Sequence, residues 1–112
     1  MFEIAEIVKS LQDLTKRYGL KILYVDFTDV TLISRIGFSH EIFIHIYTNV
    51  KKEKLNMALI VAGERIYGID KEGSFYHEHL VENPLLHVST EPVEIENFVV
   101  QSLEVLKTMN LI

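Results

Sequence analysis

Two histidines separated by one residue, His77 and His79, are the side chains of this sequence best suited to chemistry. On a β-strand, residues two apart point to the same face and lie roughly 7 Å apart along the strand. Two imidazoles at this spacing can ligate one metal ion, or act as acid and base on either side of a reacting group. The pattern is also typical of half-exposed structural histidines in a sheet, so these interpretations stay open.

The residues opposite this pair follow from the two turns that flank the preceding strand. One is a two-residue turn signal and the other a three-residue turn signal: Gly63-Glu64 and Lys71-Glu72-Gly73. Turns of these lengths place Tyr67 opposite His77 and Arg65 opposite His79, and cross-strand partners share a face. The sequence therefore predicts a polar patch made of these four residues.

Asp70 stands just before the predicted turn and is most simply a turn residue whose carboxylate accepts backbone N–H groups. Strict alternation puts it on the other face from Tyr67. It can therefore orient an imidazole only if the turn curls it toward the patch.

His45 depends on the length of the loop around residues 51–53. A three-residue loop sends Ile44 and its neighbouring isoleucines to the histidine face, whereas a four-residue loop sends His45 and Tyr47 there. Burial of the isoleucines favours the four-residue loop. With that loop, His45 joins the patch.

Composition excludes several classes of protein. The 112 residues are 48% hydrophobic and contain no Cys. The lack of Cys excludes disulfide frameworks, thiolate nucleophiles and zinc ribbons. Nucleotide-binding glycine motifs, the P-loop and the nucleophile elbow are also absent from the sequence. A net charge of -5 argues against a protein that simply coats nucleic-acid phosphates. We predict no cofactor.

The order of elements comes from the hydrophobic period. Residues 2–18 follow a helical period and end at Gly19, and a second helical stripe runs from Pro92 to Met109. Between them lie runs rich in β-branched and aromatic residues: 20–34, 38–50, 54–62, 65–70, 74–80 and 85–88. The breaks after the first two runs are Arg35-Ile36-Gly37 and Lys51-Lys52-Glu53, and a further turn is expected at Asn83-Pro84.

These connections are short enough for hairpins, so the sheet is expected to be antiparallel. The sequence predicts a single α+β domain over residues 1–112, in which a meander of four to six strands carries both helices on one face. The acidic amino terminus and the lack of a membrane-length apolar run favour a soluble cytoplasmic protein.

Residues 58–106 resemble the TumE-type toxins of prokaryotic toxin-antitoxin pairs. The resemblance rests on ALIVAGERIYGIDKEGSFYHEHL followed by ENPLLHVSTEPVEIENFVVQSLEVL: a strand, a Gly-Glu turn, a strand ending in Asp, a turn with Gly, the H-x-H pair and a closing helix. The family pattern falls on Gly63, Glu64, Asp70, His77 and His79. Family members show Tyr-Asp-Asn where this chain has Ile69-Asp70-Lys71, and residues 2–34 lie outside the match.

The resemblance implies a small toxin that a partner antitoxin neutralises and that arrests growth by attacking RNA. In that chemistry one histidine removes the ribose 2′-OH proton and the other protonates the leaving oxygen. Arg65 or Lys71 would stabilise the charge that develops on the phosphate. The predicted catalytic residues are His77, His79 and Asp70, and the predicted substrate-binding residues are Arg65, Tyr67, His45 and Lys71.

A second hypothesis is a non-catalytic interaction module with structural histidines. A small α+β domain with an edge strand and an apolar sheet face commonly forms a homo-oligomer or binds a peptide by strand addition. A third hypothesis, a metal site built on His77, His79 and His45, lacks a fourth ligand in the sequence.

Overall fold

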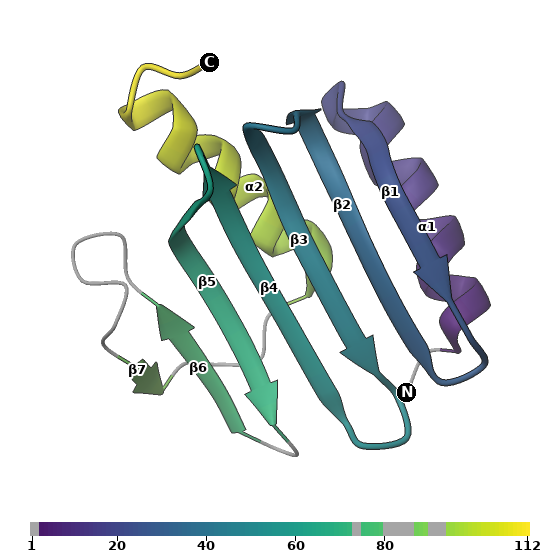
Figure 1. Ribbon diagram of the computed structural model, residues 1–112. Helices are drawn as coiled ribbons and strands as arrows, with labels where there is room; N and C mark the ends of the chain where they lie inside the picture. The colour runs from purple at the N-terminus through teal and green to yellow at the C-terminus, as the bar shows by residue number, and fades with distance from the viewer. Residues whose placement is uncertain (1–2, 73–74, 80–86, 90–93) are drawn as a thin grey trace.

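The computed structural model describes residues 3–72, 75–79, 87–89 and 94–112, the strands between 75 and 89 by their backbone. The chain begins with α1 (Ile4–Tyr18), continues through a seven-stranded antiparallel meander and ends with α2 (Ile95–Thr108) (Figure 1). The strands are β1 (Lys21–Phe27), β2 (Thr31–Ser39), β3 (Ile42–Asn49), β4 (Lys54–Val61), β5 (Glu64–Glu72), β6 (Phe75–His79) and β7 (His87–Ser89).

This architecture confirms the predicted α+β class. The strands β1 to β5 form the expected meander, each paired with the next along the chain, and β6 and β7 extend it at one edge. Neither described helix is long and apolar enough to cross a membrane. The predicted turn at Asn83-Pro84 and the predicted start of the second helical stripe at Pro92 lie outside the described residues.

The α1 helix forms where the period predicts it. Its buried stripe includes Ile4, Ile7, Leu11 and Leu14, and Gly19 caps it in the left-handed conformation at φ +68°. The Gly19 N–H donates to the Thr15 carbonyl, as expected for a glycine that ends a helix. In α2, Phe98, Val99 and Leu106 are buried, whereas Met109 caps the helix and is 40% exposed.

The first hairpin turn corrects the prediction of one long strand over residues 20–34. The chain turns directly after β1, where the Thr28 hydroxyl accepts hydrogen bonds from the N–H groups of Val30 at 3.2 Å and Thr31 at 3.1 Å. A threonine that stabilises a turn in this way gives a weaker sequence signal than glycine. The predicted break at Arg35-Ile36-Gly37 is wrong, because these residues lie inside β2.

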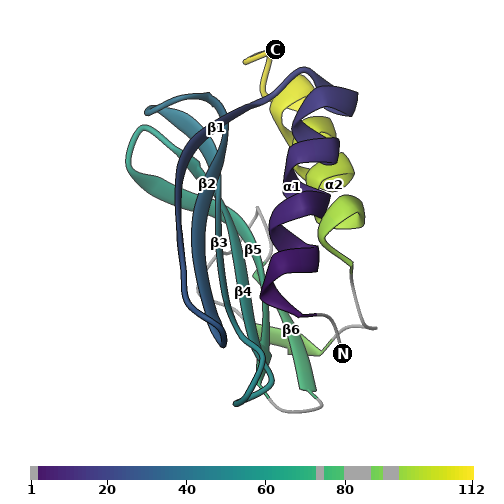
Figure 2. The ribbon, with the colours of Figure 1, turned by 90° about the vertical axis from the view of Figure 1, so that its right-hand side faces the viewer.

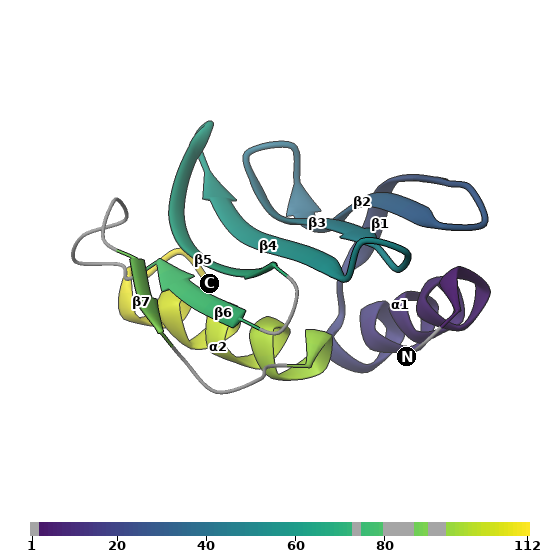
Figure 3. The same cartoon turned by 90° about the horizontal axis from the view of Figure 1, so that it is seen from below.

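Both helices pack on the same face of the sheet (Figures 2 and 3). Ile44 and Ile46 of β3 and Met57 and Leu59 of β4 point to this side and are buried. The alternate residues of the same strands belong to the opposite face, on which neither described helix packs. We call that opposite side the open face; its residues include Tyr24, Arg35, Phe43, His45, Tyr47, Asn56, Ala58 and Asp70.

Gly37 of β2 stands at a point of the sheet that has no room for a side chain. A Cβ added there would lie 2.6 Å from both the Ile42 carbonyl oxygen and the Phe43 Cα atom. These are backbone atoms, which cannot rotate away. The β2 backbone also shifts register with β3 just beyond Gly37, so the glycine permits a close approach of the two strands at an irregular point.

We expect Gly37→Ala to lower the free energy of unfolding by roughly 1–3 kcal/mol, the cost of overpacking a tight contact. Urea or thermal unfolding of the full chain measures this. Gly63→Asn is the matched control, because Gly63 has φ +81° with no atom within 4 Å of an added Cβ, and asparagine tolerates that backbone conformation. Equal stability of the Gly37→Ala variant and the native chain would contradict the close approach.

Candidate functional site

The pairing of β5 with β6 places the histidine pair differently from the sequence prediction. Asp70 is opposite His77, and Gly68 is opposite His79. The predicted partners Tyr67 and Arg65 are therefore wrong. The reason is the turn: β5 continues to Glu72 and β6 begins at Phe75, which leaves two residues between the strands. This shifts the register by an odd number of residues, and an odd shift exchanges the faces of the sheet.

Tyr67 belongs to the helix-covered face. Its side chain is buried, and its ring stacks on Phe98 of α2 with 5.2 Å between centroids and 5° between planes. Tyr67 thus anchors α2 to the sheet. Its side chain lies on the opposite face of the sheet from Asp70. Arg65 is exposed and opposite Ile60, at the start of β5.

Lys71 is likewise separated from the open face. It is opposite Leu55 of β4 and lines a cavity on the helix side of the sheet. The prediction that Lys71 shares a site with Asp70 therefore does not fit the register. Successive residues of a strand point to opposite sides, which is why these neighbours in sequence lie on different faces.

His45 and Tyr47 lie on the open face, which confirms the four-residue loop. Asn49 pairs with Lys54, so residues 50–53 form the connection and the β3 isoleucines face the core. His45 pairs with Arg35 on one side and with Ala58 on the other. Partial burial, and secondly the positive charge of Arg35, hold the pKa of His45 below its ordinary value.

Two cross-strand rows of the open face lead to the histidine positions of β6. One row runs through Arg35, His45, Ala58 and Gly68 to the backbone position of His79. The second row runs from Asp26 through Ile33, Tyr47, Asn56 and Asp70 to the backbone position of His77. The fold thus brings His45, Asp70 and the two β6 positions onto adjacent rows. The side chains of His77 and His79 lie outside the described part of the structure.

Arg35 is the functional candidate that the sequence analysis missed. Its guanidinium carbon lies 5.9 Å from the centroid of the Tyr24 ring and 5.4 Å from that of Phe43. Cations at these distances from aromatic rings are attracted to the ring faces. The alternation of Ile33 and Arg35 with buried Leu32, Ser34 and Ile36 was the available signal, but the prediction of a chain break at this point concealed it.

A cavity of about 660 Å³ opens on the other side of the sheet, between α1, the start of α2 and the β3–β4 turn. Its lining combines apolar and charged side chains, among them Ile7, Leu14, Leu55, Ile95, Lys9 and Lys71. The cavity shares no lining residue with the rows that lead to His77 and His79. It is therefore a concave feature separate from the predicted site.

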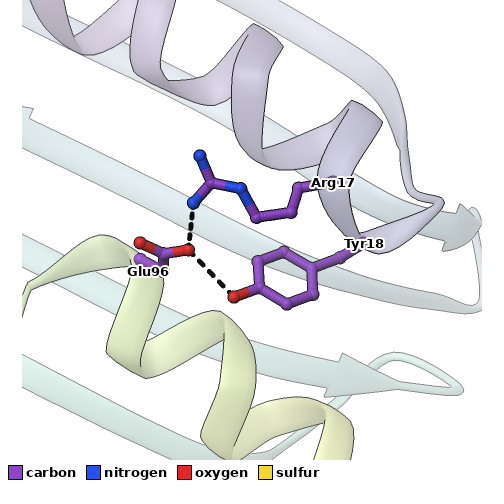
Figure 4. A network of polar contacts seen from close by, with 3 residues as sticks. All are labelled: Arg17, Tyr18 and Glu96. Carbon is purple, nitrogen blue, oxygen red and sulfur yellow. Dashed lines mark hydrogen bonds and ion pairs between the residues drawn. The ribbon is translucent and has the colours of Figure 1, made fainter.

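The two helices are joined beside this cavity by a polar network (Figure 4). The Glu96 carboxylate accepts a hydrogen bond from the Tyr18 hydroxyl at 2.9 Å and forms an ion pair with Arg17. The hydrogen bonds from Tyr18 and Arg17 hold the pKa of Glu96 below its ordinary value. Because the network is exposed, we assign it a positioning role between the helices and no part in chemistry.

A metal site is not formed by the described residues. No three His, Asp or Glu side chains in this part of the chain gather closely enough to hold an ion. Comparison of the chain with protein-family models, with curated proteins and with solved structures gives no match. The register and the described side chains are therefore the features of the molecule that bear on its function.

The two causes of the His45 pKa shift can be separated by replacing Arg35. In Arg35→Gln we expect the pKa of His45 to rise but to stay below its ordinary value, because burial is the larger cause and remains. NMR titration of the imidazole measures the shift. An unchanged pKa in Arg35→Gln would contradict the electrostatic contribution.

The depressed pKa also makes stability depend on pH. The unfolded chain binds a proton to His45 more tightly than the folded chain does, so this group destabilises the fold as the pH falls below about 6.5. His45→Gln should weaken that part of the pH dependence.

Proposed function

We propose that this chain is a TumE-like toxin of a prokaryotic toxin-antitoxin pair that cleaves RNA with His77 and His79. The observation that carries the proposal is the β5–β6 register, in which Asp70 is the cross-strand partner of His77. A carboxylate beside an imidazole favours one tautomer and stabilises the protonated ring. The resemblance of residues 58–106 to that toxin family falls on these same positions.

The proposed reaction needs a base and an acid on either side of one phosphodiester. His77, oriented by Asp70, removes the proton from a ribose 2′-OH, and the 2′ oxygen attacks the phosphorus atom. The bond from phosphorus to the 5′ oxygen breaks, and His79 gives that oxygen a proton. The products are a 2′,3′-cyclic phosphate and a free 5′-OH. Imidazoles suit both steps because they exchange protons near neutral pH.

The open face supports this assignment through its shape and chemistry. Ala58 and Gly68, which lie between His45 and the position of His79, carry no large side chain that would obstruct a substrate chain along this row. Arg35 lies in the same row and supplies a positive charge. Phosphate contacts of this kind position a nucleic acid, whereas the histidines carry the reaction.

The direct test is inducible expression of the chain in a bacterial host, with growth and total RNA followed over time. We expect arrest and RNA cleavage by the native chain, and loss of both in the His77→Ala/His79→Ala double variant. Asp70→Asn should reduce cleavage by about 10- to 100-fold, since it removes the proposed orienting charge.

His40→Ala is the matched control, because His40 lies in the β2–β3 turn, away from these rows. Arrest that persists at full strength in the double variant would contradict the assigned roles. Rescue by a co-expressed neighbouring gene product would identify the antitoxin.

A second candidate function, a homodimeric interaction module, is favoured by the β1 edge. Among the described strands β1 pairs with β2 alone, and its exposed side chains include Ile22 at 39%, Val25 at 40% and Phe27 at 52%. An edge strand with exposed apolar side chains and unpaired backbone groups is suited to pairing with a second strand. A second copy of the chain can supply that strand.

Val25→Lys tests this candidate, because a charged side chain on an edge strand opposes strand pairing. If β1 joins two copies, the native chain should elute as a dimer in size-exclusion chromatography with light scattering, and Val25→Lys should shift it to a monomer. Val100→Lys makes the same change at an apolar residue of α2 that is 38% exposed. A monomeric native chain at high concentration would exclude the dimer.

A further inference from the structure

Three side chains of the open face form what we call the aromatic–arginine patch: Tyr24 of β1, Arg35 of β2 and Phe43 of β3. The Arg35 guanidinium lies over both rings, and the Tyr24 side chain is 48% exposed. No carboxylate in the described part of the chain forms an ion pair with Arg35. An exposed positive charge held between rings is therefore available to a ligand.

Positive charge is concentrated on two rows of the open face, whereas the row on the other side of Arg35, through Ile33, carries Asp26 and Asp70. The row through Lys21, Gly37, Phe43, Ile60 and Arg65 and the row from Tyr24 and Arg35 to Gly68 contain basic residues and no acidic residue. This holds although the whole chain carries a net charge of -5. A ligand that follows these two rows meets positive charge and aromatic surface.

We infer that the aromatic–arginine patch binds single-stranded RNA, with an unpaired base stacked on Tyr24 and a backbone phosphate beside Arg35. The inference rests on the proposed function, which it deepens by naming the form of the RNA. Aromatic side chains on an uncovered sheet stack well on splayed bases, and a basic surface follows the phosphates. Paired bases in a duplex do not expose their faces to such a ring.

The patch and the position of His79 lie far apart along one row. From Arg35 to the position of His79 the row crosses four strand spacings of roughly 4.8 Å each, or about 19 Å. The patch is thus too far away to touch the reacting phosphate. It holds the strand some nucleotides away from the cleavage point, which makes Tyr24 and Arg35 positioning residues.

The test measures binding separately from cleavage. The full-length His77→Ala/His79→Ala chain is titrated into a labelled 12-nucleotide single-stranded RNA, and fluorescence polarisation reports the Kd. We expect Tyr24→Ala in this background to weaken binding at least about five-fold, the effect of losing one stacked base. Tyr24→Phe keeps the ring and should bind like the parent chain.

Arg35→Gln should weaken binding and reduce the slope of log affinity against log salt by about 0.7, the contribution of one phosphate contact on a single strand. Matching single-stranded DNA and duplex RNA complete the comparison. We expect weaker binding to the duplex. Equal affinity for duplex and single strand would overturn the stacking inference, as would an unchanged Kd in Tyr24→Ala.

Two outcomes separate this inference from the proposed function. Binding that depends on Tyr24, without cleavage by the native chain, supports the patch and overturns the nuclease proposal. Cleavage that depends on the histidines, together with unchanged RNA binding by Tyr24→Ala, supports the nuclease proposal and overturns the inference about the patch. If Tyr24→Ala instead abolishes self-association and leaves RNA binding intact, the patch is a contact between copies and the inference is wrong.

Discussion

The connection between β3 and β4 fixes which residues of the sheet are available for function. Asn49 and Lys54 are paired across it, and the Asn49 side chain accepts a hydrogen bond from the Lys52 N–H at 3.0 Å. This holds a connection of four residues. With one residue fewer, every β3 side chain would change faces, so that His45 would enter the core and Ile46 would face solvent. Burial of the isoleucines beneath the helices opposes that exchange.

The two faces that result have different roles. On one face, α1 and α2 pack on aliphatic residues, and the stacking of Tyr67 on Phe98 joins α2 to β5. Both helices, α1 of 15 residues and α2 of 14 residues, pack on this face. The open face consequently keeps polar and aromatic side chains, because no described helix covers it and water can contact it. Candidate chemistry is concentrated there for this physical reason.

Much of this organisation could be predicted from the sequence. Periods of 3.6 and 2 residues predict α1, the stripe of α2 and the antiparallel meander, and burial of the isoleucines predicts that His45 is on the open face. The partners of the histidine pair could not be predicted, because they depend on one turn length. The predicted turn of three residues makes Tyr67 the cross-strand partner of His77. The observed turn has two residues, and the partner is Asp70. Arg35 was missed for a similar reason: a turn held by the Thr28 hydroxyl carries no glycine to mark it.

The overall acidity of the chain and an RNA ligand are compatible once charge is considered by surface. The net charge of -5 includes acidic residues of α1 and α2 such as Glu6, Asp13 and Glu104, and the helices pack on the face away from Arg35. At physiological salt, exposed charges further apart than about 8 Å are largely screened from each other. A phosphate beside Arg35 therefore responds mainly to the charges of the open face within that distance, and little to the acidic helices. Acidic helices can also limit non-specific binding to nucleic acid, so that recognition depends on the open face.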